Sequence, residues 1–424
     1  MSWRIAPIGR GDNLLYSQAG TPSLDLRFAS NKSLVDAITG SNLVDFTRAS
    51  SGTYVGSDGL IKTATTNEPR FDHDPTTGES LGLLMEESRT NLLINSVWAG
   101  ATTGTPGNAP TNWVTAFGAN TETTLVSSVF GSADGAQAIK FNADSGERIM
   151  FAQTINVVSG TTYTLSVNVE SIVGNIGKAL TVIAGTADRT LISGDVDTTN
   201  SGKAVLVFTA NSTGTVNIRI GVGTTVGVSE TVEATLSRPQ LEAGSFPTSY
   251  IPTSGAGVIT PGYTAPAVTR AADVASISGS NFSGWYRQDE GTVFSEWDAA
   301  AFTARPVSFN DGGGNNAIGL VGTSGYIGQN IYVGNSFEGT AGVNGSYLPN
   351  TVYRQVGSYA VNNAIDSVNG ALGPVDTSCS IPTVNQALIG QGRTGGSSPH
   401  SGHIHRLTYW PARLPNETLQ TITQ

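Results

Sequence analysis

Residues 23–62 read SLDLRFASNKSLVDAITGSNLVDFTRASSGTYVGSDGLIK, and this stretch decides the fold class. Leu24, Leu26 and Phe28 alternate with charged residues, and this period of two is typical of a half-buried strand. Residues 52–62 predict a hairpin, because the central Asp-Gly pair supplies the positive φ angles that a tight reversal requires. The stretch therefore predicts short strands joined by turns.

The composition extends this prediction to the whole chain. Only 13% of the 424 residues are charged, about half the usual share, whereas 52 are Gly. Surface helices need Glu, Lys and Arg on their solvent-exposed faces, while Thr, Ser, Val and Gly suit strands and turns. We expect an all-β, multi-domain fold, with helices only at residues 81–91 and after Asn416, a residue that suits a helix N-cap.

Changes in pattern divide the chain into four parts. Residues 1–92 form an N-terminal region, whose first 19 residues show no periodicity. Residues 93–250 and 270–424 are two strand-rich units, and residues 251–269 are a stiff, proline-rich linker between them. The strands that alternation or β-branched residues predict are 43–48, 138–141, 163–169, 204–208, 216–220, 291–297, 326–333, 352–361, 387–390 and 403–410.

Three segments carry a resemblance to tailed-phage fibre and minor structural proteins. Residues 23–92 resemble the module that opens many of these proteins. Two further segments agree: RPQLEAGSFPTSYIPT at 238–253 with VTRAADVASI at 268–277, and GHIHRLTYWPARLPNETLQTIT at 402–423. The resemblance implies a non-enzymatic fibre or decoration protein of the virion, on the head or on the tail.

The same resemblance implies a role for each unit. Residues 1–92 would attach to other virion proteins and hold a homotrimer together, since fibres are commonly trimeric. The middle unit resembles the jelly-roll carbohydrate-binding modules, and residues 270–424 resemble the concanavalin-like, laminin-G-type sandwich that closes many phage fibres. These units would present binding surfaces to a host-surface glycan.

Charge and residue usage exclude several other classes. The net charge of −10 and a pI near 4.9 argue against a nucleic-acid partner, because phosphate neutralisation needs clustered Lys and Arg. The single cysteine, Cys379, is expected to be a small buried or loop thiol. No secretory signal and no membrane-spanning apolar run are recognised, which suits a protein that is assembled into virions in the host cytoplasm.

Two clusters have the residue types of metal sites. His403 and His405 lie on one face of a predicted strand, near His400, so a threefold axis could gather six imidazoles around a transition metal. Solvent-facing histidines are the favoured interpretation. The oxygens around Asp311 in NDGGGNN could bind calcium, but a hairpin tip explains them better because one carboxylate is a weak anchor. We predict no metal and no cofactor.

No catalytic constellation is recognised. Three candidate carboxylate pairs for glycoside hydrolysis are sequence neighbours, which rarely face each other across a sugar: Asp72 with Asp74, Glu86 with Glu87, and Asp289 with Glu290. A serine-nucleophile elbow is missing from the sequence as well. We therefore predict a protein without enzymatic activity; the alternatives are a glycan-cleaving tail spike and a decoration protein without a receptor-binding role.

Aromatic residues are the more promising binding feature. Trp285 and Tyr286 lie in a turn-rich, polar setting beside Asn281 and Asp289, where rings could stack on a sugar while the polar groups hold its hydroxyls. Trp297, at the end of an alternating run, is expected in the core. These four residues, Trp285, Tyr286, Asn281 and Asp289, are the predicted glycan-binding site.

The tripeptide Thr-Arg-Ala occurs twice, each time just ahead of a strand-rich unit. It places Arg48 and Arg270 at equivalent points of two similar sequences. Coincidence in a Thr- and Ala-rich chain is one explanation. The other is that each arginine ties a linker to the adjoining module by hydrogen bonds to backbone carbonyls.

Overall fold

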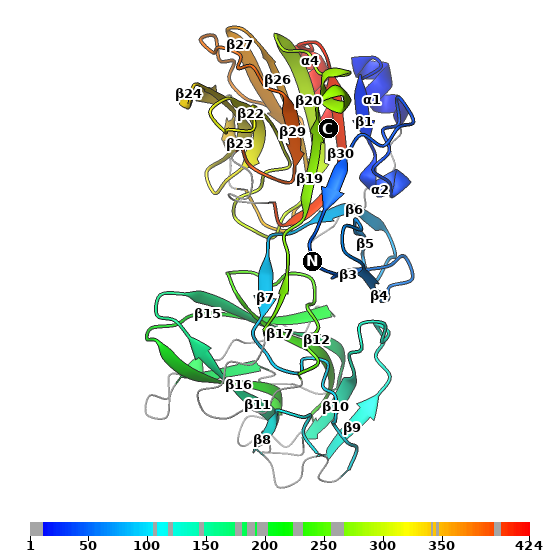
Figure 1. Ribbon diagram of the computed structural model, residues 1–424, viewed down its shortest axis with the longest axis vertical. Coiled ribbons are helices and arrows are strands. Elements are labelled where there is room, and N and C mark those ends of the chain that lie inside the picture. The colour runs from blue at the N-terminus through cyan, green and yellow to red at the C-terminus, as the bar shows by residue number, and fades with distance from the viewer. Residues whose placement is uncertain are drawn as a thin grey trace.

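The computed structural model describes residues 12–104, 108–117, 122–143, 148–173, 180–184, 191–192, 202–223, 232–255, 267–340, 342–344, 347–393 and 400–424. The fold is all-β, as predicted, and consists of two β-sandwiches, one above the other in Figure 1. Helices are scarce in this described part: α1 (Asp12–Ala19), α2 (Phe28–Asn31), α3 (Ser280–Ser283) and α4 (Asn416–Ile422).

The upper lobe of Figure 1, which we call the split sandwich, contains two eight-stranded sheets within the described residues. The strands of its first sheet are, in order, β28 (Ala371–Leu372), β27 (Asn363–Val368), β26 (Tyr353–Ala360), β20 (Glu290–Trp297), β30 (Gly402–Trp410), β6 (Ser80–Met85) and β5 (Phe71–His73), with β1 (Leu24–Leu26) also paired to β30. The strands of its second sheet are β2 (Asp45–Thr47), β19 (Val274–Ser278), β29 (Gln386–Ile389), β21 (Val307–Asn310), β22 (Ala317–Gly322), β23 (Tyr326–Val333) and β24 (Ser336–Thr340), with β25 (Val343–Asn344) also paired to β23.

The lower lobe, which we call the inserted sandwich, pairs two five-stranded sheets in the part of the chain that is described. One sheet has the order β15 (Gly202–Thr209), β12 (Thr162–Val173), β17 (Val232–Ala243), β10 (Ala138–Ala143) and β9 (Glu122–Val126). The other has the order β14 (Leu191–Ile192), β13 (Leu180–Ala184), β16 (Gly214–Gly223), β11 (Arg148–Val157) and β8 (Val114–Phe117). Its core is aromatic: the rings of Phe141 and Phe151 meet edge to face at 5.1 Å, and both pack on buried Trp98.

Two short strands join the lobes. β7 (Arg89–Asn91) leads into the inserted sandwich, β18 (Val268–Arg270) leads out of it, and the two pair antiparallel. The hairpin of β3 (Gly52–Val55) and β4 (Ile61–Ala64) lies beside this junction, and its Gly59 has a φ of +74°, as the sequence predicted for the turn. The predicted strands of both larger units are present as well.

The predicted separate N-terminal region of residues 1–92 is wrong. β1 and β6 both pair with the C-terminal strand β30, and β2 pairs with β19. The apolar faces of these strands fill one core with the C-terminal strands; Leu24, Leu26 and Leu83 belong to the same buried cluster as Leu407 and Tyr409. The blue and the orange-to-red segments therefore share the upper lobe in Figure 1. Sequence pattern could not reveal this, because strand partners are not encoded locally.

The predicted helix at residues 81–91 is also wrong. This segment forms β6 and β7, and the apolar run is buried on both faces of the sheet, a pattern that helices share. Gly82 has a φ of +92°, and a Cβ there would lie 2.4 Å from the carbonyl oxygen of Ile404, so the pairing with β30 requires glycine.

The ends of the chain agree better with the sequence. The C-terminal helix is confirmed as α4, with Pro415 rather than Asn416 at the N-cap. Part of the segment without periodicity forms α1, whose Leu15 is buried against α4 residues Leu419 and Ile422. Of the predicted linker, residues 251–255 are packed against the inserted sandwich, β18 is paired, and residues 256–266 lie outside the described residues.

Candidate functional site

A cleft of about 370 Å³ opens where the two sandwiches meet the β3–β4 hairpin. Its lining comes from segments that are far apart in the sequence. The lining residues are Thr53, Tyr54, Val55, Ile61, Asp72, Pro75, Leu84, Glu86, Phe130, Asn168, Gly202, Lys203, Phe246, Pro247, Thr248, Ser249, Tyr250, Asp298, Ala300, Asn350, Ser401, Gly402 and His403. Sites between two structural units are common places for ligands to bind.

One wall of the cleft carries a chain of carboxylates and imidazoles. Asp72 on β5 lies 3.0 Å from Nε2 of His403, whose Nδ1 lies 3.0 Å from Asp298. Asp298 also lies 3.1 Å from Nε2 of His405. His403 and His405 contact the same carboxylate because they alternate on β30, as the sequence predicted for one face of a strand.

The charges of this wall are fixed by its own contacts. Burial alone would lower the pKa of His403, but the charges and hydrogen bonds of Asp298 and Asp72 raise it to about 10. Burial alone would likewise raise the pKa of Asp298, but His403 and His405 hold it well below its usual range. Near pH 7 His403 is therefore an imidazolium and Asp298 a carboxylate.

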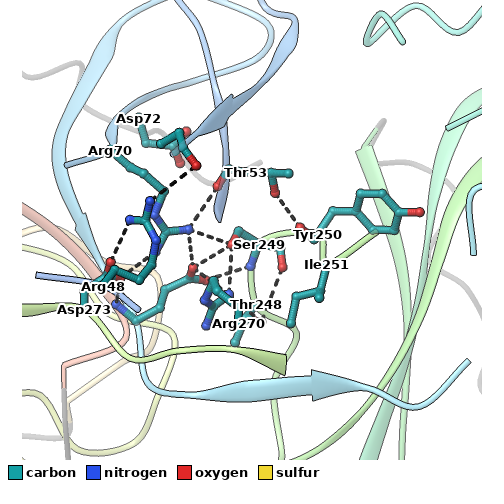
Figure 2. A network of polar contacts seen from close by, with 12 residues as sticks. Arg48, Thr53, Arg70, Asp72, Thr248, Ser249, Tyr250, Ile251, Arg270 and Asp273 are labelled. Carbon is teal, nitrogen blue, oxygen red and sulfur yellow. Dashed lines mark hydrogen bonds and ion pairs between the residues drawn. The ribbon is translucent and has the colours of Figure 1, made fainter. Parts of the chain in front are cut away.

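A buried ion-pair network adjoins the cleft through Glu86, which lines it. Figure 2 shows Arg48, Arg70 and Arg270 converging there. Arg70 lies 2.7 Å from Glu86 and 2.5 Å from Asp273, and its side chain is fully buried. Arg48 pairs with Asp273 at 3.1 Å, and Arg270 pairs with Glu86 at 2.9 Å. These contacts join strands from the beginning of the chain to strands that follow the inserted sandwich.

The second explanation of the repeated Thr-Arg-Ala tripeptide is confirmed in its contacts. Arg48 donates to the backbone oxygens of Ser50 and Thr65, and Arg270 donates to that of Glu87. Both arginines enter the same network, so each ties a strand end to the junction between the lobes.

The segment that follows β17, residues 244–253, is the tail of the inserted sandwich, and it contacts residues of the split sandwich and of the β3–β4 hairpin at the junction. Glu86 accepts hydrogen bonds from the backbone nitrogen of Ser249 at 2.7 Å and from its hydroxyl at 2.6 Å. The Thr53 hydroxyl donates to the Tyr250 carbonyl at 2.5 Å, a contact drawn in Figure 2. This tail lies within residues 238–253 and supplies part of the lining of the cleft.

Other residues that line the cleft combine apolar rings with hydrogen-bonding groups. Tyr54 and Phe246 are half-buried, and Asn350 is exposed. Lys203 at the start of β15 donates to the Thr248 carbonyl at 3.2 Å and keeps part of its side chain exposed. Rings of this kind suit the apolar faces of sugars, while carboxylate, amide and ammonium groups suit their hydroxyls.

The predicted glycan-binding residues do not form an exposed site. The side chains of Trp285 and Tyr286 are only 6% and 8% exposed, and both pack against Phe309 and Tyr409 of other strands. The two rings are thus part of the core of the split sandwich, and their assignment as ligand-binding residues is wrong. The turn-rich sequence misled because strands brought from far along the chain cover the rings.

The two polar members of that prediction do lie on the surface. Asn281 is exposed, and its amide donates to the Leu43 carbonyl at 3.4 Å. Asp289 is exposed and forms an ion pair with Arg287 at 2.6 Å. Without the rings beside them, these residues lack the stacking surface that motivated the prediction.

The interpretation of the histidines as solvent-facing is also wrong. His400 and His405 are buried, and His403 is only partly exposed. Burial lowers the pKa of His400 to about 4, and its ring meets the edge of Trp297. Within the described residues, no group of three or more His, Cys, Asp or Glu side chains has the geometry of a metal site.

The loop around Asp311 has the structure of a hairpin tip. β21 pairs with β22, and Asp311 accepts hydrogen bonds from the backbone of Gly313 and Gly314 and from the side chain of Asn316. These turn contacts account for the oxygen-rich sequence. Cys379 is buried, as predicted, and Trp297 is in the core.

The neighbouring carboxylate pairs of the sequence do not face each other across an open space. Glu86 is held in the arginine network, while Asp72 contacts His403. Asp298, which the sequence analysis missed, faces Asp72 with His403 between them. Nothing in its local sequence, which simply follows β20, distinguishes Asp298 from an ordinary loop aspartate. Among the described helices, none is long and apolar enough to cross a membrane.

Comparison with known proteins gives only distant similarities. No protein-family model matches the sequence, and no curated protein matches it. Among solved structures, the CBM40 module of Ruminococcus gnavus IT-sialidase bound to α2,3-sialyllactose is 15% identical, with a TM-score of 0.29, and the match covers 32% of this chain and 83% of that chain. Trypanosoma rangeli sialidase in complex with sialic acid is 12% identical, with a TM-score of 0.27, and the match covers 78% of this chain and 56% of that chain. A heptameric SAP-like pentraxin from Limulus polyphemus is 14% identical, with a TM-score of 0.25, and the match covers 32% of this chain and 70% of that chain. Similarity at this level defines no ligand for this chain.

Proposed function

We propose that the chain is a structural protein of a phage virion, a fibre or fibre-like decoration protein that binds a host-surface glycan in the cleft between its two sandwiches. The observation that carries the glycan part is the cleft itself. Half-buried rings, an exposed amide, an ammonium group and a carboxylate line one space of about 370 Å³. The virion part is supported by the sequence resemblance, whose three segments all contribute strands or loops to the split sandwich or to the cleft.

The cleft favours binding over cleavage. Most glycoside hydrolases use two carboxyl groups on either side of the sugar, one of which is free to give up a proton. Asp72 and Asp298 are both engaged by the same imidazolium, and the pKa of Asp298 is held low. A carboxylate with a low pKa, as in Asp298, accepts hydrogen bonds from sugar hydroxyls and makes a poor proton donor near pH 7.

Incubating the purified chain with immobilised host-surface polysaccharide tests the glycan part. Retention without shortening of the polymer is the expected result, whereas shortened polymer would identify a glycan-cleaving spike. Tyr54→Ala and Lys203→Met should both weaken retention, because each removes a group that lines the cleft. Lys140→Met is the matched control, since Lys140 lies on the same sandwich and pairs with Glu233 on its surface. Equal retention of all variants would show that the cleft is not the binding site.

Labelling intact phage particles with an antibody against residues 270–424 tests the virion part. Label on the head or on the tail would support the proposal and would also decide between a head fibre and a tail fibre. Particles without label, when the denatured virion proteins lack the chain as well, would contradict it.

A further inference from the structure

A second hollow, of about 200 Å³, lies on the split sandwich and is separate from the cleft. Its walls come from β21, β22 and β23 of the second sheet and from the loops beside them. The lining residues are Arg305, Val307, Ser308, Ala317, Gly319, Leu320, Asn330, Tyr332, Gly392 and Arg393.

The register of the sheet creates this hollow. Ser308, Gly319 and Asn330 are direct cross-strand neighbours, and they alternate with residues whose side chains fill the core of the sandwich. They therefore lie on the outward face. Ala317 and Tyr332 form the next pair on that face. Small side chains on β21 and β22 thus leave a depression bounded by larger ones on β23.

Two arginines that have no carboxylate partner in the described part of the chain line this depression. Arg393 lies over the ring of Tyr332, 3.8 Å from its centroid, and donates to the backbone oxygen of Gly314 and to Asn335. The guanidinium of Arg305 has no hydrogen-bond or ion-pair partner among the residues that the structure describes. Neither arginine forms an ion pair within that part of the chain, although acidic residues outnumber basic ones by 32 to 22.

One buried polar atom of the hollow also lacks a partner among the described residues. Ser308 is only 3% exposed, and its hydroxyl has no hydrogen-bond partner among the described residues. The Oδ1 atom of Asn330 accepts the hydroxyl of Tyr326 at 2.9 Å, which leaves its amide nitrogen as a donor. Buried hydroxyls are normally satisfied, so this one is available to a water or a ligand that enters the hollow.

The electrostatics of the pair agree with this geometry. Burial lowers the pKa of Arg305, and the charge of Arg393 lowers it further, with no carboxylate among the causes that oppose them. Guanidinium groups keep their charge in proteins even so. Two like charges that share a half-buried hollow raise the free energy of the empty site, and an anion bound between them would reverse this cost.

We propose that this hollow binds an oxyanion, a carboxylate or a phosphate group carried by an acidic sugar, between Arg305 and Arg393, with Ser308 and Asn330 as further donors. The planar guanidinium groups match the paired oxygens of either anion. The inference rests on the proposed glycan-binding function only for the sugar to which the anion is attached. It gives an acidic protein a local means of binding acidic polysaccharides that its overall charge would repel.

Titration of the full chain with glucuronate, glucose 6-phosphate and neutral glucose, followed by saturation-transfer NMR, tests the proposal. One or both charged sugars should bind, and glucose should bind at least about tenfold more weakly, because it lacks the charged acceptor. The two charged probes distinguish carboxylate from phosphate. Failure of both to bind would overturn the proposal.

Three variants assign any binding to the hollow. Arg305→Gln and Arg393→Gln should each weaken binding at least about tenfold, because each removes a charge-assisted hydrogen bond. Asn330→Asp preserves side-chain size and the acceptor for Tyr326 while placing a carboxylate beside the arginines, so it should abolish binding and keep the fold. Arg354→Gln, which removes a surface charge from the same sandwich, should bind normally. Unchanged binding in Asn330→Asp, or equal loss in Arg354→Gln, would overturn the assignment.

These outcomes are distinguishable from a failure of the proposed function. The small sugars are measured in the absence of polysaccharide, on the unsubstituted chain and on the cleft variant Tyr54→Ala. Loss of polysaccharide retention in Tyr54→Ala should leave glucuronate binding unchanged, because Tyr54 lies in the other cleft. If that variant also loses glucuronate, the anion binds in the cleft and the assignment to the hollow is wrong.

Discussion

Replacing Arg70 with methionine should destabilise the split sandwich more than any surface substitution. Methionine keeps much of the aliphatic stem but removes the guanidinium that contacts Glu86 at 2.7 Å and Asp273 at 2.5 Å. The same group also donates to the Thr53 carbonyl and the Ser249 hydroxyl. Two buried acids would then lose their common partner.

The size of the effect follows from the burial of the network. Breaking a buried ion pair by removing one partner costs about 3–5 kcal/mol, because a charge is left buried and uncompensated. Arg48 and Arg270 still contact one acid each, so we expect about 3 kcal/mol rather than the upper end. Lys62→Met is the matched control: it breaks an exposed pair with Asp58 and should cost about 0–1 kcal/mol.

Urea denaturation followed by tryptophan fluorescence and circular dichroism measures both variants. Two sandwiches need not unfold together, so the midpoint of each transition is compared, rather than one fitted value. The double variant Arg70→Met with Glu86→Gln should recover part of the loss, because one unpaired charge is then removed. If Arg70→Met behaves like Lys62→Met, the network is not a determinant of stability and the reasoning fails.

Four further outcomes are expected. Residues 93–255 alone should give a soluble, folded fragment, whereas deleting residues 1–92 should give an aggregating chain, because β30 and β19 lose strand partners; a well-folded deletion fragment would contradict the topology. The pKa of His403, raised from about 6.5 to about 10, contributes stability that is present in full below about pH 6.5 and is lost as the pH rises to about 10; the melting temperature should fall over that range in the natural chain and less in His403→Gln, and equal slopes would refute this. The double variant Trp285→Ala with Tyr286→Ala should lower the free energy of unfolding by more than about 3 kcal/mol, because both rings are buried. A change of less than about 1 kcal/mol, measured by calorimetry, would show that the rings are exposed. Sedimentation of the full chain should give the mass of a homotrimer, and a monomer at micromolar concentration would contradict that prediction.

Local pattern was sufficient for most strands, but it was insufficient for β6 and β7, which it predicted as a helix, and for the partners of the strands. Alternation in β12 and β30 is a property of adjacent residues, so the sequence predicts these strands directly. The pairing of β1 with β30 depends on packing across the whole chain, and no local signal specifies it. The same limit explains why residues 1–92 looked like a separate region.

The candidate site was harder to predict for the same reason. Asp72 and His403 are 331 positions apart, and their contact depends on two strands of one sheet. The rings of Trp285 and Tyr286 show the converse: polar neighbours in sequence suggested exposure, while Phe309 from β21 covers them. Residue type was informative for the arginines of the two Thr-Arg-Ala tripeptides. The several N–H donors of a guanidinium suit backbone carbonyls, so the contacts of Arg48 and Arg270 could be predicted from the residue type.

The insertion of one sandwich within another also sets an order for synthesis of the chain. Asp25 on β1 and its partner Arg406 on β30 are 381 positions apart, so the first strands leave the ribosome long before their partners exist. The inserted sandwich, whose strands are contiguous in sequence, can fold in the meantime. Completion of the split sandwich then waits for the last strand and the helix that follows it. Truncation within β30 would therefore leave β1 and β6 with unpaired, exposed edges, which makes this step of synthesis sensitive to aggregation.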